Sequence, residues 1–243
     1  MHIPVSYVPT AAEGLRSTAA ARGTARATAF PATLEIDYPD RDLDPLTTFF
    51  RPLTFIPIAI LLALVSGPTT IGRPPAGTET TGPVVLLTLG AGGVLFLPTL
   101  LMLVFRRKYP RWWFDWNLQL TRFTTRCLTY LALMRDEYPS TDEEQAVHLE
   151  LRYPDVEREL SRYLPLVKWL LALPHYIALA VLALGACLAV LLAWPIVLIT
   201  GRYPRRLFDY VTGVFRWGLR VGAYAFLLTT DRYPPFTLAA ERV

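Results

Sequence analysis

Two short segments of this chain have nearly the same sequence, and their repetition constrains the fold more than any other feature. Residues 108–116 read KYPRWWFDW, and residues 202–210 read RYPRRLFDY. Each segment follows a long apolar run and precedes arginines at matching distances. The pattern predicts a tandem duplication of one unit, with residues 33–139 as the first copy and residues 149–236 as the second.

Charged residues recur after each segment with the spacing i, i+7 and i+11. This spacing brings three side chains within about 20° of one line on an α-helix. We therefore expect one striped helix in each copy, beginning at Pro110 or Pro204 and ending near Met134 or Thr229. The stripe residues are Asp115, Arg122 and Arg126 in the first copy and Asp209, Arg216 and Arg220 in the second.

Long apolar runs identify the class of protein. Hydrophobic residues make up 53% of the 243 residues, and the mean hydropathy is +0.33. Residues 53–66, 84–105 and 164–200 hold a single charge, that of Lys168. Runs of this kind are typical of membrane spans. The expected fold is a mainly α integral membrane protein in which each copy has a transmembrane helical hairpin and a striped helix, with short β-strands at the start of each copy.

The hairpins differ between the two copies. In the first, residues 46–66 are expected to form a helix bent near Pro57, residues 67–83 a polar loop, and residues 84–105 a second helix that returns through the membrane. In the second, residues 164–200 would extend roughly 55 Å as one helix, against a hydrocarbon core of about 30 Å. The interpretation that follows the duplication is a tight turn near Gly185. The alternative is one kinked helix whose front part, residues 163–173, lies at the interface.

Alternating polar and apolar residues predict short strands at 33–39 and 147–154, with a related segment at 235–238. A tail at residues 1–32, a polar linker at 140–148 and a tail at 237–243 complete the division of the chain. The striped helices either cross the membrane or lie along its surface. Crossing would bury two arginines per helix, at about 2.5–3.5 kcal/mol each, which favours the flat arrangement.

Basic clusters beside the apolar runs indicate topology. With four spans and flat striped helices, the protein is expected in the inner (plasma) membrane as a multi-pass protein with both termini cytoplasmic. The pI of about 9.2 could suggest nucleic acid. Because the basic residues adjoin apolar runs and no nucleic-acid motif accompanies them, no nucleic-acid partner is expected.

No motif in the sequence predicts a metal site or a catalytic site. Cys127 and Cys187 have no metal-ligand spacing, and His175 has Ile58 at the matching position of the first copy, so no metal site is expected. Gly-rich phosphate loops, HExxH and G-x-S-x-G are all missing. We therefore expect no catalytic residues, no cofactor and no enzyme activity.

Several segments of the second half resemble a known family: LLALPH at 170–175, TGRYPR at 200–205, FDY at 208–210, RWGLRV at 216–221 and TDRYPPF at 230–236. They are similar to an uncharacterised family of bacterial, mainly actinobacterial, membrane proteins, a domain of unknown function. The first half resembles a diverged copy that keeps Tyr109-Pro110, Phe114-Asp115 and Tyr138-Pro139. The resemblance implies membrane location and duplication, and no activity.

The expected function is that of a non-catalytic accessory or scaffolding subunit of a larger membrane complex, in envelope lipid transport or respiratory assembly. Its partners would be other membrane protein subunits and anionic phospholipid, bound through the stripes by paired guanidinium groups. A structural use of the stripes within the protein is the competing interpretation. A small transporter or channel and a lipid-modifying enzyme are the alternative functions.

Overall fold

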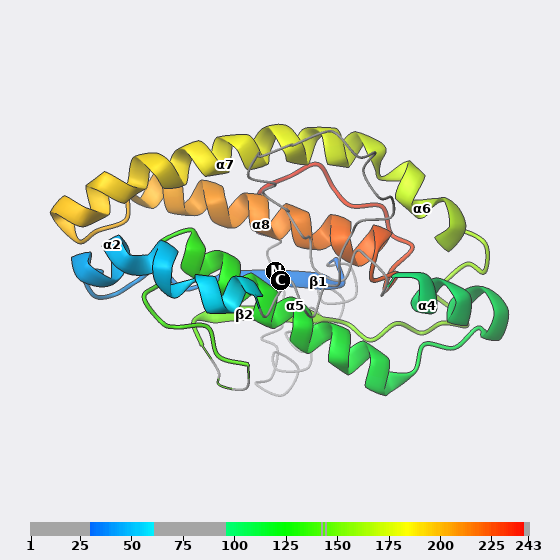
Figure 1. The fold of residues 1–243 in the computed structure, drawn as a ribbon. Helices are drawn as coiled ribbons and strands as arrows, with labels where there is room; N and C mark the ends of the chain where they lie inside the picture. The colour runs from blue at the N-terminus through cyan, green and yellow to red at the C-terminus, as the bar shows by residue number, and fades with distance from the viewer. Residues whose placement is uncertain (1–29, 61–95, 142, 144, 241–243) are drawn as a thin grey trace, which may run out of the picture. The chain divides into compact units, whose positions relative to one another are not determined.

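The computed structural model describes residues 30–60, 96–141, 143 and 145–240. Pro31–Ala240 form one compact unit, which holds the helices and strands below (Figure 1). In chain order they are β1 (Ala32–Ile36), α2 (Pro45–Thr54), α4 (Phe96–Leu101), the π-helix η1 (Met102–Arg106), α5 (Arg111–Leu131), β2 (Val147–Leu151), α6 (Pro165–Leu171), α7 (Leu173–Thr200) and α8 (Arg205–Ala225). The mainly helical class is confirmed.

The two strands form an antiparallel sheet. Leu34 of β1 lies opposite Leu149 of β2. Side chains alternate along each strand, so Leu34 and Leu149 are buried on one face while Glu35, His148 and Glu150 are exposed on the other. This alternation is the pattern from which the strands were predicted. The sheet buries its apolar face against helices and exposes its polar face.

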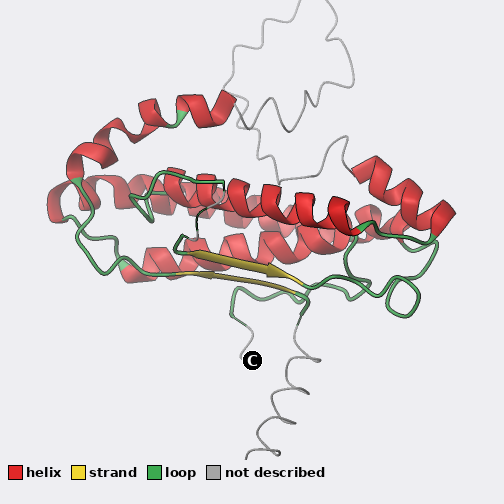
Figure 2. Cartoon of the chain, turned by 90° about the horizontal axis from the view of Figure 1, so that it is seen from below, coloured by secondary structure: helices red, strands yellow, loops and turns green. Residues whose placement is uncertain are grey.

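Each striped helix packs on the strand that comes from the other half of the chain. The helix near the C-terminus, α8, packs on β1, and α5 packs on β2. A further layer is formed by α7, which packs along α8, and Figure 1 draws α7, α8 and the strands with their long axes nearly aligned. Figure 2, turned by 90°, shows the strands on one side of these helices. A strand from each half of the chain is thus held by the helix of the other half.

The turn expected near Gly185 is wrong, because α7 is helical without interruption from Leu173 to Thr200. Gly185 serves close packing instead: a Cβ at this position would lie 2.4 Å from the hydroxyl oxygen of Tyr210. The alternative of a kinked helix describes this segment better. Its break falls at Ala172, between α6 and α7.

Both striped helices are present but shorter than predicted. They end at Leu131 and Ala225, before Leu133 and Leu228, whose φ angles are +64° and +55°. A residue with left-handed backbone angles cannot continue a right-handed α-helix, so neither helix extends past these leucines.

Other boundaries also differ from the predictions. The bend expected near Pro57 falls at Phe55, and helix then continues to Ile60. Residues 235–238 form no third strand. The carbonyl groups of Thr237 and Leu238 accept hydrogen bonds from arginines of α8.

One of the described helices, α7, is long and apolar enough to cross a membrane. The predicted loop at 67–83, most of the span at 84–105 and the N-terminal tail lie outside the described residues. The multi-pass topology and the position of the termini therefore stay predictions.

Candidate functional site

The arginine stripe of α8 is directed at backbone carbonyl groups. Arg216 Nε donates to the Leu34 carbonyl at 3.0 Å, and Arg216 Nη1 donates to the Leu238 carbonyl at 3.2 Å. Arg220, which is 2% exposed, donates to the carbonyls of Thr237 and Ala239 at 3.1 and 2.9 Å. These two side chains fasten the C-terminal segment and β1 to the helix.

The stripe of α5 makes the corresponding contacts in the other half. Arg122 Nε donates to the Leu149 carbonyl at 2.9 Å, and Arg126 Nη1 donates to the Ser140 carbonyl at 2.8 Å. Arg122 is half-buried and Arg126 is buried. Both stripes therefore direct guanidinium groups into the fold.

The carbonyls of Leu34 and Leu149 matter because they lie on the free edges of the sheet. The bonds Asp37 N to Ala146 O and Arg152 N to Pro31 O mark the hydrogen-bonded pairs. Pairs alternate in an antiparallel ladder, so Leu34 and Leu149 form a non-bonded pair whose backbone groups point outward. Free strand edges recruit other chains unless they are covered. Arg216 and Arg122 each cover one edge.

The aspartates of the stripes are arranged differently. Asp115 and Asp209 are exposed. Asp209 and Arg216 line a shallow depression of about 400 Å³ together with Glu35 and the buried Thr212. Burial lowers the pKa of Arg216, and the charges of Glu35 and Asp209 oppose that shift. The predicted stripe thus divides into inward arginines and outward aspartates.

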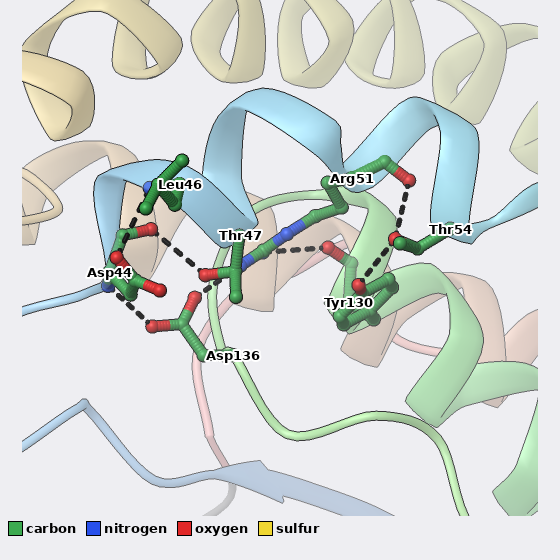
Figure 3. Close-up of polar contacts among 7 residues, drawn as sticks. All are labelled: Asp44, Leu46, Thr47, Arg51, Thr54, Tyr130 and Asp136. Carbon is green, nitrogen blue, oxygen red and sulfur yellow. Dashed lines mark hydrogen bonds and ion pairs between the residues drawn. The ribbon is translucent and has the colours of Figure 1, made fainter.

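A buried cation that the site prediction missed is Arg51 of α2, which is 1% exposed. Figure 3 shows that it reaches the loop after α5. Its Nη1 donates to the Tyr130 carbonyl at 2.9 Å, its Nη2 pairs with Asp136, and its guanidinium lies 4.6 Å from the centre of the Tyr130 ring. Asp136 also accepts a bond from the Asp44 backbone N–H at 2.8 Å.

Lys168 of α6 has the same surroundings in the second half. The side chain is fully buried, and Nζ lies 2.7 Å from the Thr230 carbonyl and 2.7 Å from Asp231. Its ammonium group lies over the Tyr224 ring at 5.3 Å. Asp231 accepts a bond from the Ser161 backbone N–H at 2.6 Å. The sequence feature that could have indicated both buried cations is a single basic residue in an apolar run. A helix that contains a tyrosine and an Asp-x-Tyr-Pro segment follow it in the chain.

Two tyrosines after the strands connect the halves. Tyr38 donates to the Tyr203 carbonyl, and its ring is covered by Arg205 at 4.5 Å. Tyr153 donates to the Tyr109 carbonyl, and its ring is covered by Arg111 at 4.8 Å.

His175 has a packing role in the structure. Its Nδ1 accepts a bond from Trp217 Nε1 at 3.2 Å, and its ring stacks on Phe236 at 4.0 Å. Within the part of the chain that is described, no three His, Cys, Asp or Glu side chains gather closely enough to hold a metal ion.

The second half matches a known family. Residues 165–237 match the model of a domain of unknown function, DUF4389. No curated protein and no solved structure matches the chain. The match fits the predicted resemblance to an uncharacterised domain family, whereas the bacterial origin and the duplication stay predictions. It covers Lys168, Asp209, Arg216 and Arg220, so the matched segment contains the buried cation of α6 and the stripe of α8.

The edge-covering contact leads to a prediction for Arg216. We expect Arg216→Ala to lower the free energy of unfolding by about 1–2 kcal/mol, because the Leu34 carbonyl loses its donor. Arg122→Ala removes the matching donor from Leu149 and should have a similar effect. Denaturant titration in detergent measures both. A change below about 0.3 kcal/mol in both variants would contradict the structural use of the stripes.

Proposed function

We propose that the chain is a non-catalytic integral membrane protein that acts as an accessory or scaffolding subunit of a larger membrane complex. The observation that carries the proposal is the exposure of α7. Only 22% of its most apolar 18-residue window is buried inside the protein. A core helix of a water-soluble protein hides most of its apolar surface, so the exposure of a helix of this composition supports a location in the membrane.

We further propose that the chain contains two copies of one membrane unit. The support is the recurrence of contacts: a buried cation over a tyrosine ring occurs as Arg51 on Tyr130 and as Lys168 on Tyr224. The edge-covering bonds and the tyrosines that join the halves recur in the same way. Leu34 and Leu149, which the duplication makes equivalent, lie opposite each other in the sheet.

The use of the polar groups supports a scaffold. The stripe arginines donate to carbonyls of this chain, and the buried cations are paired with aspartates. Groups held in this way fix the fold. Of the stripes, the exposed carboxylates of Asp115 and Asp209 are accessible to a partner subunit.

Membrane washing tests the location. After expression in cells, the protein should stay in the membrane pellet through alkaline carbonate and high salt, and mild detergent should release it. Release by carbonate alone would overturn the proposal.

Mild detergent also tests the accessory role. Native electrophoresis of the extract should show the protein in a complex larger than itself, with a partner in fixed stoichiometry. A single species of the protein alone would refute that role, and ion flux through vesicles holding only the purified protein would support a transporter.

A further inference from the structure

Among the described residues, most of the exposed large apolar side chains lie on α2, α4 with η1, α6 and α7, and we call these side chains the apolar face. They come from α2 (Leu46, Phe49, Leu53, Ile56 and Ile60, the last two in its continuation), α4 and η1 (Leu97, Leu101, Phe105), α6 (Leu166, Trp169, Leu170) and α7 (Ile177, Val181, Leu184, Leu188, Leu191, Ile199). Of these helices, α2 contacts α7 directly, and α6 leads into α7.

The apolar face runs the whole length of α7. Ile177 near one end is 70% exposed, Leu188 in the middle is 55% exposed, and Ile199 at the other end is 85% exposed. At about 1.5 Å per residue, these positions extend over roughly 33 Å. That length fits two orientations, across the hydrocarbon core of a bilayer or within the plane of one leaflet.

Packing around α8 distinguishes the two orientations. On one side α8 meets α7, through the bond of Trp217 to His175 and the close approach of Tyr210 to Gly185. On another side α8 meets β1, through the bond of Arg216 to the Leu34 carbonyl. The sheet is therefore held beside the length of α7, and Figures 1 and 2 show the strands lying along the helix axes.

A perpendicular α7 would carry exposed charges into the hydrocarbon. Asp209 adjoins Tyr210, which lies against the middle of α7, and Glu35 adjoins Leu34. Glu150 and His148 are exposed on the outer face of the same sheet. Charges at that depth are costly and need partners. In the in-plane orientation, the apolar face enters the bilayer and the polar face of the sheet stays in water.

Exposed basic residues at both ends of the helical layer also favour the in-plane orientation of α7. Arg202, Arg205 and Arg206 follow the C-terminal end of α7. Near the other end, Arg106, Arg107 and Lys108 follow η1, and Arg162 before α6 is joined to η1 by its bond to the Val104 carbonyl at 3.0 Å. A spanning helix has its basic residues mainly on one side of the membrane. Two basic ends suit a helix whose ends both lie among anionic head groups.

We propose that the apolar face is a docking surface for one leaflet of an anionic phospholipid bilayer, with α7 lying in the membrane plane and the basic ends binding lipid phosphates. The proposal rests on the membrane location proposed above and specifies its geometry. It also assigns lipid contact to the basic ends in place of the stripes.

Depth measurement along α7 tests the orientation. In a Cys187→Ala background, single cysteines replace Ile177, Leu188 and Ile199 in turn, and each carries a fluorophore. The protein is placed in vesicles of phosphatidylcholine with phosphatidylglycerol, and lipids brominated at known depths quench the fluorophore. Cys127 is fully buried, and burial raises the pKa of its thiol to about 12, so it stays unlabelled. Glu150→Cys on the outer face of the sheet is the aqueous control.

The three labels on α7 should lie at the same depth within about 5 Å, below the head groups of one leaflet. A label at Leu188 deeper than both others by more than about 10 Å would show a spanning helix and overturn the proposal. Loss of quenching at all three positions would show that no bilayer covers the face, which overturns the proposed location as well. Protection of the labels in a dimer without quenching would assign the face to a second copy.

Charge reversal tests the lipid contacts. Arg106→Glu with Arg206→Glu, one substitution at each end, should weaken flotation with phosphatidylglycerol vesicles at least about tenfold. The matched control, Arg152→Glu with Arg158→Glu after β2, should change flotation less than about twofold. Equal effects of the two pairs would show that net charge alone acts and would refute binding at the ends.

Discussion

Replacing Asp231 by alanine is expected to lower the free energy of unfolding by about 3–5 kcal/mol, because it leaves a charged side chain buried without its partner. Lys168 has 0% exposure and Asp231 has 17%. Burial lowers the pKa of Lys168, and Asp231 opposes that shift by its hydrogen bond and its charge. Unfolding titrations in mixed detergent micelles measure the loss.

The same variant should depend on pH in a defined direction. Without Asp231, the folded-state pKa of Lys168 falls further below the unfolded value of about 10.4. The folded state then prefers the neutral amine, so the variant gains stability relative to the wild type as the pH rises toward that value. The matched variant Asp136→Ala leaves Arg51 buried without its carboxylate partner, and the Arg51 guanidinium stays charged. This variant should lose a similar free energy of unfolding, and it should not regain stability as the pH rises.

Two controls separate burial from charge. Substituting both partners, Lys168→Met with Asp231→Leu, should restore most of the stability, since an apolar pair needs no partner. Arg158→Ala removes one member of an exposed pair, in which Arg158 is 87% exposed, and should change stability by less than about 0.5 kcal/mol. A loss below 1 kcal/mol in Asp231→Ala would contradict the buried pair.

The sequence predicted the elements whose signal is local. Alternation identified β1 and β2, and the spacing of Arg216 and Arg220 identified one face of α8. The proline before each striped helix marked its start to within one residue. These features depend on neighbours in the chain, which the sequence shows directly.

The use of each polar group was harder to predict, because it depends on contacts between distant segments. The Arg216 side chain bonds to Leu34, 182 positions away in the chain, and no spacing rule reports such a pair. The turn near Gly185 failed for the same reason. A glycine in an apolar run fits a turn or a close helix contact equally well, and only the position of Tyr210 decides between them.

The close contact at Gly185 leads to the second large effect. Gly185→Ala should lower the free energy of unfolding by about 1–3 kcal/mol. The loss is expected even though alanine has a higher helix propensity than glycine, by about 1 kcal/mol. The new Cβ would meet the Tyr210 hydroxyl oxygen at 2.4 Å and the ring carbon that bears it at 3.3 Å. That hydroxyl is held in place, because it donates to the Leu182 carbonyl at 3.0 Å.

Gly222 provides the matched control, since it also lies inside a helix but a Cβ there would meet nothing within 4 Å. Gly222→Ala should therefore stabilise the protein by about 0.5–1 kcal/mol. Adding Tyr210→Phe to Gly185→Ala removes the clashing oxygen and should return part of the loss, so that the two substitutions together cost less than the sum of each alone. Additive effects, or stabilisation by Gly185→Ala alone, would show that α7 and α8 are not packed closely at this point. Such a result would remove the contact that fixes α7 alongside α8, and with it the geometric basis for holding the sheet beside the apolar helix.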